Sequence, residues 1–221
     1  VVRILVLNPN SSQAITRVLS RVADDWAAAS GNDVVTEYLP DAPELLPPNR
    51  MPKRGKGGSE RGRIALWHSL AHIEFVAIDL ALDMAGRFGA EMGEGFVSDF
   101  LTVAADEAMH FALLERHLAT LGSHYGALPA HSGLWDAASE TAHDVAARLA
   151  VVPMVLEARG LDVTPATLER VRAAGDERGA RILSRILDDE IAHVRFGSTH
   201  FIVVATSRGE KLGAYAQPLR L

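Results

Sequence analysis

The sequence of 221 residues contains no cysteine. This absence excludes disulfide bonds, zinc–thiolate sites, iron–sulfur clusters and cysteine nucleophiles together. No apolar run approaches the roughly 18 consecutive residues that a membrane-spanning helix needs, and the opening VVRILVL is too short for a cleavable signal sequence. Positive charge is in deficit, since the net charge is −6, which argues against general binding of nucleic acid. We therefore expect a cytoplasmic protein without a membrane partner.

Two Glu-x-x-His pairs occur in the chain, and each follows a further glutamate at the same interval of 33 residues. The six residues are Glu74, Glu107 and His110 in the first copy and Glu157, Glu190 and His193 in the second. The second copy lies 83 residues after the first. A repeat of this kind, with each ligand type in the same order, indicates a functional constellation.

The spacing of each pair suits a metal site on helices. Residues three apart share one face of an α-helix, so each pair presents a carboxylate and an imidazole together. The glutamates lie on the apolar stripes of their predicted helices, and burying a carboxylate without compensation costs several kcal/mol. Two divalent cations would balance the four negative charges. We predict that all six residues are ligands of a dinuclear metal site inside a four-helix bundle.

Helical periodicity extends over most of the chain after residue 58 and predicts an all-α fold. The long helices are expected over 59–88, 94–121, 133–159 and 180–206. Pro153 should kink or bulge the third helix beside Glu157, and Gly160 should end it. Thr164 and Pro165 should then begin a short helix that Gly175 and Gly179 interrupt. The segment 122–132 is long enough to cross the bundle from end to end, as a ferritin-like crossover requires.

Two aspartates directly precede the glutamates of the pairs. Asp106 and Asp189 could each accept the free ring N–H of a ligand histidine from the second coordination shell, which would hold the imidazole in one tautomer. Other histidines lack such a pattern, and we expect His72 to form a structural hydrogen bond.

The ligand types also indicate the metal. Sites rich in carboxylate with one imidazole per metal suit iron or manganese better than zinc or copper. Two iron ions are the expected cofactor, with a manganese pair or a mixed iron–manganese pair as alternatives. Dioxygen or peroxide would be the co-substrate.

The chain divides into four segments. They are an N-terminal extension over 1–38, a proline-rich and basic arm over 39–58, the helical bundle over 59–207 and a tail over 208–221. The extension should hold a short strand followed by a helix over roughly 13–30. The arm, with Lys53, Arg54 and Lys56, is the only feature that would favour RNA.

Six motifs resemble a bacterial ferritin-like family of unknown function, which is similar to the di-iron tRNA hydroxylases. They are ELLPPNRMPKR, AHIEFVAIDLALD, AADEAMHFALL, YGALPAHSGLWDAA, VVPMVLEARGLDVTP and DDEIAHVRFG. The resemblance spans residues of about 40–209 and implies a ferritin-like four-helix bundle with a crossover and the same six metal ligands. The opening VVRILVLNPNSSQAITRVL instead resembles the start of aspartate/glutamate/hydantoin racemases. Those enzymes use a pair of cysteines, so racemase activity is not expected.

We therefore expect a non-haem di-iron oxidoreductase, of the oxygenase or oxidase type. It would hydroxylate or oxidise a small-molecule or nucleoside-type substrate. A ferroxidase or metal-storage protein and a manganese enzyme that breaks down peroxide are the alternatives. A homodimer is compatible with each of these functions.

Overall fold

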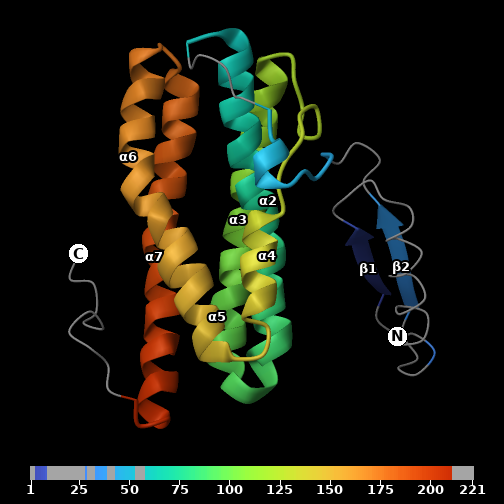
Figure 1. The fold of residues 1–221 in the computed structure, drawn as a ribbon, viewed down its shortest axis with the longest axis vertical. Coiled ribbons are helices and arrows are strands. Elements are labelled where there is room, and N and C mark those ends of the chain that lie inside the picture. The colour runs from blue at the N-terminus through green and yellow to red at the C-terminus, as the bar shows by residue number, and fades with distance from the viewer. Residues whose placement is uncertain (1–2, 9–27, 29–32, 39–42, 53–57, 211–221) are drawn as a thin grey trace.

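The computed structural model describes residues 3–8, 28, 33–38, 43–52 and 58–210. It confirms the prediction of a mostly helical protein (Figure 1). In chain order the elements are β1 (Arg3–Asn8), β2 (Asp33–Tyr38), η1 (Pro48–Arg50), α2 (Glu60–Met92), α3 (Glu94–Thr120), α4 (Gly133–Glu140), α5 (Val145–Val151), η2 (Val152–Glu157), α6 (Ala158–Ala173) and α7 (Glu177–Ser207).

The N-terminal region contributes a small parallel sheet. Strand β1 is the predicted one, and it pairs with β2 from Arg3 opposite Asp33 to Asn8 opposite Tyr38. The second strand was not predicted, although its sequence DVVTEY contains several residues that favour extended backbone. The helix predicted over 13–30 lies almost wholly outside the described residues, as do Lys53, Arg54 and Lys56 of the basic arm and residues 211–221 of the tail.

The first two long helices, α2 and α3, form an antiparallel pair that packs along its length. Ser59 begins α2, because its hydroxyl accepts a hydrogen bond from the Gly62 amide at 3.1 Å. Gly93 alone joins the two helices. Its φ of +88° lies in the left-handed region that side chains disfavour, so glycine permits this short connection.

The chain crosses back along this pair before the second half begins. After α3, residues 121–144 form the crossover, in which a loop and α4 run down beside α2. Helix α5 then turns upward (Figure 1). The predicted helix over 133–159 was therefore wrong, because α4 ends at Glu140 and belongs to the crossover. Asp144 starts the new helix, since its carboxylate accepts a hydrogen bond from the Ala147 amide at 2.8 Å.

The second half consists of α5, η2 and α6 in unbroken succession, with α7 returning beside them. The expected bulge at Pro153 is confirmed: η2 is a π-helical turn in which the Ala158 amide bonds to the Pro153 carbonyl five residues earlier. Proline lacks the amide hydrogen that an α-helical turn would use here.

Two predicted helix boundaries were wrong. Gly160 does not end a helix and Pro165 does not begin one, because α6 continues through both to Ala173. In a helix interior, glycine costs about 1 kcal/mol and proline about 3 kcal/mol relative to alanine. Packing offsets these costs, since Leu168 and Val171 of α6 are buried in one core cluster with residues of α7.

The predicted start of the last helix was also late. Helix α7 begins at Glu177, capped by Asp176, so Gly179 lies in its first turn. A Cβ atom at Gly179 would overlap the indole of Trp67. The glycine therefore serves close helix packing and does not interrupt the helix.

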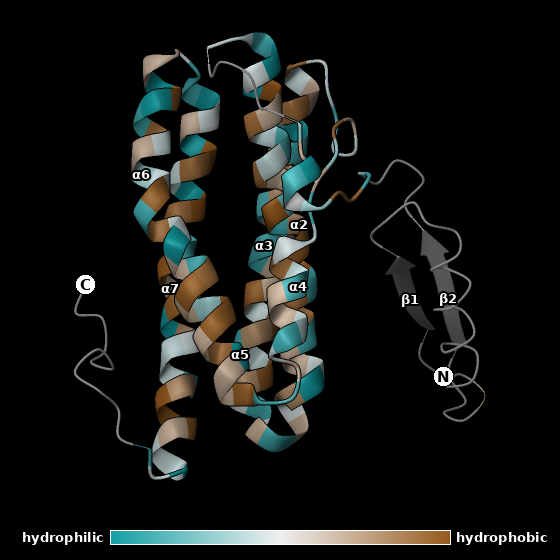
Figure 2. Ribbon diagram, in the orientation of Figure 1, coloured by the Kyte–Doolittle hydropathy of each residue, from teal (hydrophilic) through white to brown (hydrophobic). Residues whose placement is uncertain are grey.

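The long helices bury one face each. Figure 2 shows hydrophobic and hydrophilic residues interspersed along every long helix. One core cluster surrounds Trp67, Leu114 and Leu183, and a second surrounds Met84, Phe100 and Leu149.

One helix within the described residues, α2, is long and apolar enough to cross a membrane by length and composition alone. No such helix is expected from the sequence pattern. Because α2 packs against α3 and buries Trp67, Glu74 and Met84, its apolar composition has an explanation in the helical core.

Replacing Gly197 of α7 with alanine should destabilise the fold by about 1–3 kcal/mol, the usual cost of overpacking. A Cβ atom there would overlap the ring of Pro153, so α7 and the π-helical turn would have to separate. Urea unfolding measures the change. Gly160→Ala is the matched control: nothing lies within 4 Å of its Cβ position, so it should stabilise the helix by about 0.5–1 kcal/mol. Equal effects of the two substitutions would contradict this explanation.

Candidate metal centre

The six predicted ligands come from four helical segments. Glu74 lies on α2, Glu107 and His110 on α3, Glu157 at the end of η2, and Glu190 and His193 on α7. Carboxylate and imidazole atoms of Glu74, Glu107, His110 and Glu190 lie within 4.8 Å of one another, which makes this buried cluster able to hold a metal ion.

His110 faces two carboxylates. Its Nδ1 atom lies 3.2 Å from Glu74 Oε2 and 3.3 Å from Glu107 Oε2. All three side chains are buried, and His110 has no exposed surface. These two nitrogen–oxygen distances are those expected between neighbouring ligand atoms of one metal ion.

His193 faces the other oxygen of the same glutamate. Its Nδ1 atom lies 3.2 Å from Glu107 Oε1 and 3.7 Å from Glu190 Oε2. These three atoms are buried, yet none of them forms a hydrogen bond. Buried polar atoms without hydrogen bonds are rare in proteins and call for an explanation such as a bound ion. Glu107 thus lies between the two histidines, with one oxygen toward each.

Glu157 lies near enough to Glu190 and Glu107 for their charges to change its pKa. Burial, followed by the charges of Glu190 and Glu107, raises its pKa to about 8. It is not among the residues within 4.8 Å of one another. The π-helical turn ends at Glu157, so the bulge determines where this carboxylate enters the bundle.

The remaining carboxylates differ sharply in acidity. Burial raises the pKa of Glu74 well above its usual value of 4.5, and burial also raises that of Glu190. For Glu107 burial acts in the same direction, but the facing rings of His110 and His193 lower its pKa to about 2. Glu107 is therefore the permanent anion of the cluster.

Both histidines hold protons strongly in the metal-free protein. Burial alone would lower the pKa of His110, but the carboxylates of Glu107 and Glu74 raise it to about 10. Burial likewise opposes the charge on His193, and Glu107 and Glu190 raise its pKa to about 11. Protons therefore compensate the buried carboxylates when no cation does so.

The Nε2 atom of each histidine faces the aspartate that precedes the other Glu-x-x-His pair. His110 Nε2 lies 3.0 Å from Asp189 Oδ2, and His193 Nε2 lies 3.3 Å from Asp106 Oδ2. An Nε2–H that donates to the aspartate leaves Nδ1 as the ligand atom. Arg185 Nε donates to Asp189 at 2.6 Å. Arg185 is not among the predicted site residues, although it lies four residues before Asp189 on α7, a common spacing for helical ion pairs.

The predicted structural role of His72 is confirmed. Its ring lies 2.9 Å from the Tyr125 hydroxyl and 3.0 Å from the His131 carbonyl oxygen, both in the crossover. His68 accepts hydrogen bonds from the Gly126 and Leu128 amides. These two histidines of α2 attach the crossover to the bundle.

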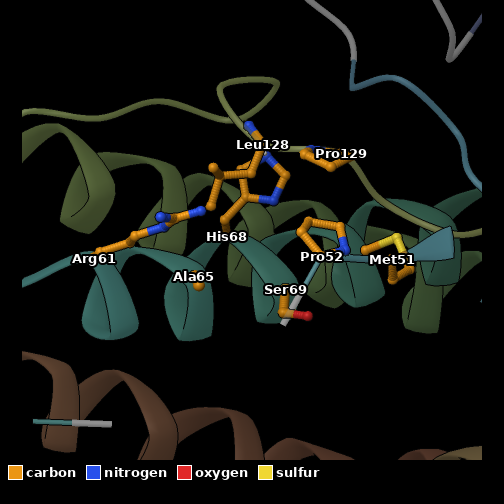
Figure 3. Close-up of a pocket in the computed structure, with 8 residues that line it drawn as sticks. All are labelled: Met51, Pro52, Arg61, Ala65, His68, Ser69, Leu128 and Pro129. Carbon is orange, nitrogen blue, oxygen red and sulfur yellow. Dashed lines mark hydrogen bonds between the residues drawn. The ribbon is translucent and has the colours of Figure 1, made fainter. Parts of the chain in front are cut away.

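Figure 3 shows His68 at a small cavity between α2, the crossover and the segment before α2. The cavity has a volume of about 50 Å³, which is enough for a few water molecules. It is separate from the cluster of carboxylates, since it contains no acidic residue.

The comparisons with known proteins identify a family without a described reaction. The family described as "Protein of unknown function (DUF455)" matches residues 9–220. An uncharacterized protein of Haemophilus influenzae is 48% identical over 177 residues. That alignment covers 77% of this chain but 61% of the relative, so the chain spans less than two thirds of the relative's length. No solved structure gives a significant match.

Proposed function

Because the chain belongs to the DUF455 family of proteins of unknown function, we propose its activity from the site alone: it is a dinuclear-iron oxidoreductase that oxidises an organic substrate with dioxygen. The observation that carries the proposal is the set of three buried ligand atoms without hydrogen bonds, His193 Nδ1, Glu107 Oε1 and Glu190 Oε2.

The fold we assign is the ferritin-like four-helix bundle. Its four helices would be α2, α3, the continuous stretch from α5 through η2 to α6, and α7. The crossover that contains α4 would join the two halves. In di-iron carboxylate bundles, two helices each provide a glutamate and the other two each provide a Glu-x-x-His pair. Among the described residues, the order of these ligands along the chain agrees with that scheme.

The residues fit a pair of cations. A metal ion would bind the three atoms that form no hydrogen bond and would replace the protons held by the histidines. Glu107, with an oxygen toward each histidine, would help to hold both ions. His110 with Glu74 would hold one ion, and His193 with Glu190 the other, while Glu157 would complete the set.

The donor set suits iron or manganese, because hard carboxylate oxygens dominate it. Bound as a diferrous pair, iron would supply the two electrons that insertion of one oxygen atom of dioxygen into a C–H bond requires. Asp189 and Asp106 would hold the two imidazoles in the tautomer that leaves Nδ1 free. Burial of the surrounding side chains would limit the access of water.

Oxygen uptake by the iron-loaded protein tests this proposal. The protein is loaded anaerobically with Fe(II), its metal content is measured, and oxygen consumption is followed after mixing with aerated buffer. We expect consumption of about one dioxygen per two irons. A loaded protein that consumes no oxygen would overturn the proposal, and a large cage that accumulates many irons per chain would favour storage instead.

Metal affinity should rise with pH. At pH 7 the pKa values place protons on both histidines and on Glu157, whose pKa is about 8, and the pKa of Glu74 is also raised. These protons must leave when cations bind, so between about one and two protons should be released per ion at pH 7. Calorimetric titration with Mn(II), in buffers that differ in their heat of protonation, measures the number. Affinity that is constant between pH 6 and 8, to within about twofold, would contradict this explanation.

A further inference from the structure

A cavity beside α6 lies at the end of the bundle where α2 begins and α6 ends. It has a volume of about 520 Å³, within the range of sites for small molecules. Its residues come from three places: the first turns of α2, the second half of α6 and the cap of α7. They include Arg63, Leu66, Trp67, Arg170, Val171 and Asp176.

Within the described part of the chain, no carboxylate forms an ion pair with the arginines of this cavity. The Nε atom of Arg63 is buried and forms no hydrogen bond. Arg170 donates to the Ala166 carbonyl at 3.2 Å and to the Thr167 hydroxyl at 2.9 Å, both uncharged groups of its own helix. A buried guanidinium N–H without an acceptor is costly, so the cavity favours an anion.

Asp176, the acidic residue that lines the cavity, already contacts other groups through both of its carboxylate oxygens. One oxygen of Asp176 accepts a hydrogen bond from the Gly179 amide at 2.8 Å, and the other lies 2.9 Å from His117 Nε2. Asp176 therefore caps α7 and holds His117, which leaves Arg63 uncompensated. The first turn of α2 also lines the cavity through Gly62, and the amide dipoles at a helix start add positive potential.

One side of the cavity is apolar, since Leu66, Trp67 and Val171 line it. Trp67 is 1% exposed and Val171 is 6% exposed, and both belong to one core cluster that Leu66 extends. A hydrated inorganic ion would gain nothing from such walls, whereas a flat apolar group would bury its surface against them.

We propose that this cavity is a binding site for a small organic anion, with one carboxylate or phosphate group on Arg63 and a flat apolar body against the apolar side of the cavity at Leu66 and Val171. A guanidinium fork binds either head group through two parallel hydrogen bonds. Trp67 and Glu74 lie seven residues apart, about 10 Å along α2, so this site is separate from the metal centre and does not depend on the proposed function.

Calorimetric titration of the full chain with two aromatic anions, phenyl phosphate and benzoate, tests the proposal. Inorganic phosphate and benzyl alcohol serve as the head group alone and the neutral body alone. We expect at least one aromatic anion to bind with a Kd below about 1 mM, and both partial ligands to bind at least about 10-fold more weakly. The tighter of the two anions identifies the head group. Binding should be equal with and without bound metal.

Two variants locate the ligand. Arg63→Gln should weaken binding at least about 10-fold, because it removes the charge, and Ala174→Phe should block the cavity without changing its charge. Arg61→Gln is the matched control, since Arg61 is an exposed residue of α2 that lines the small cavity of Figure 3. No saturable binding of either aromatic anion, equal binding of inorganic phosphate, or binding that Ala174→Phe leaves intact would overturn the proposal. Circular dichroism shows whether each variant is folded, and Ala174→Phe retains the test if Arg63→Gln is not.

Discussion

Replacing Glu107 with alanine should abolish the proposed binding of two metal ions. Glu107 is 1% exposed, and its two oxygens face Nδ1 of His110 and of His193 at 3.3 and 3.2 Å. No other described residue lies within hydrogen-bonding distance of both rings on their Nδ1 side. Loss of a residue that only supports a ligand costs about 10–100-fold in metal affinity, so loss of the shared carboxylate should cost more than about 100-fold.

Elemental analysis of the purified variant measures this loss. The unaltered chain should carry about two ions, and the variant far fewer after dialysis. Asp188→Ala is the matched control, because Asp188 is an exposed carboxylate of α7 two residues before Glu190. Full metal content in the Glu107 variant would show that this carboxylate does not connect the two ions.

Replacing Arg148 with alanine should lower the free energy of unfolding by about 3–5 kcal/mol, the usual cost of removing one partner from a buried ion pair. Arg148 of α5 is 1% exposed. It contacts Asp83 of α2, donates to the Thr141 hydroxyl at 2.9 Å and donates to the Ala138 carbonyl at 2.7 Å. These bonds attach the start of α5 both to α2 and to the end of the crossover, so their loss leaves several polar groups unpaired.

Urea unfolding of the metal-free protein measures the effect, with Arg87→Ala as the matched control. Arg87 contacts the same Asp83 at 2.6 Å, but its side chain is 43% exposed, and exposed pairs contribute about 0–1 kcal/mol. Equal losses in the two variants would contradict the importance of burial.

The ion pair of Asp83 also has a predicted pH dependence. Burial acts to raise the pKa of Asp83, but hydrogen bonds from Arg87 and Arg148 lower it below the usual 3.8. A lowered folded-state pKa stabilises the fold above the usual value, and this stabilisation is lost as the pH falls through the folded-state pKa. The difference between the Arg148 variant and the unaltered chain should therefore shrink in acid.

The positions of the long helices were predictable because apolar residues recur with the helical period over many turns. The start of α3 at Glu94 and the bulge at Pro153 follow from local chemistry, since glycine ends helices and proline lacks an amide hydrogen. The same local rules wrongly predict a helix end at Gly160 and a helix start at Pro165. Burial of Leu168 and Val171 in the core that they share with α7 outweighs the cost of both residues within α6.

The crossover shows a second limit of local patterns. Residues 133–140 are helical, as expected, but they run against α2 as part of the crossover, and the helix that leads to Glu157 starts only at Val145. The decisive contacts are long-range: His72 with Tyr125, and Arg148 with Asp83. Such contacts leave no periodic signal in the chain.

The sequence by itself determined which side chains could form the centre. The two Glu-x-x-His pairs and the glutamates 33 residues before them can be recognised in the sequence. Residues three apart lie on one face of a helix, so each pair can bind the same group. Only the tertiary structure decided how these side chains meet. It turns Nδ1 of both histidines toward Glu107 and pairs each Nε2 with the aspartate of the opposite helix, since α3 and α7 lie side by side with these faces toward each other.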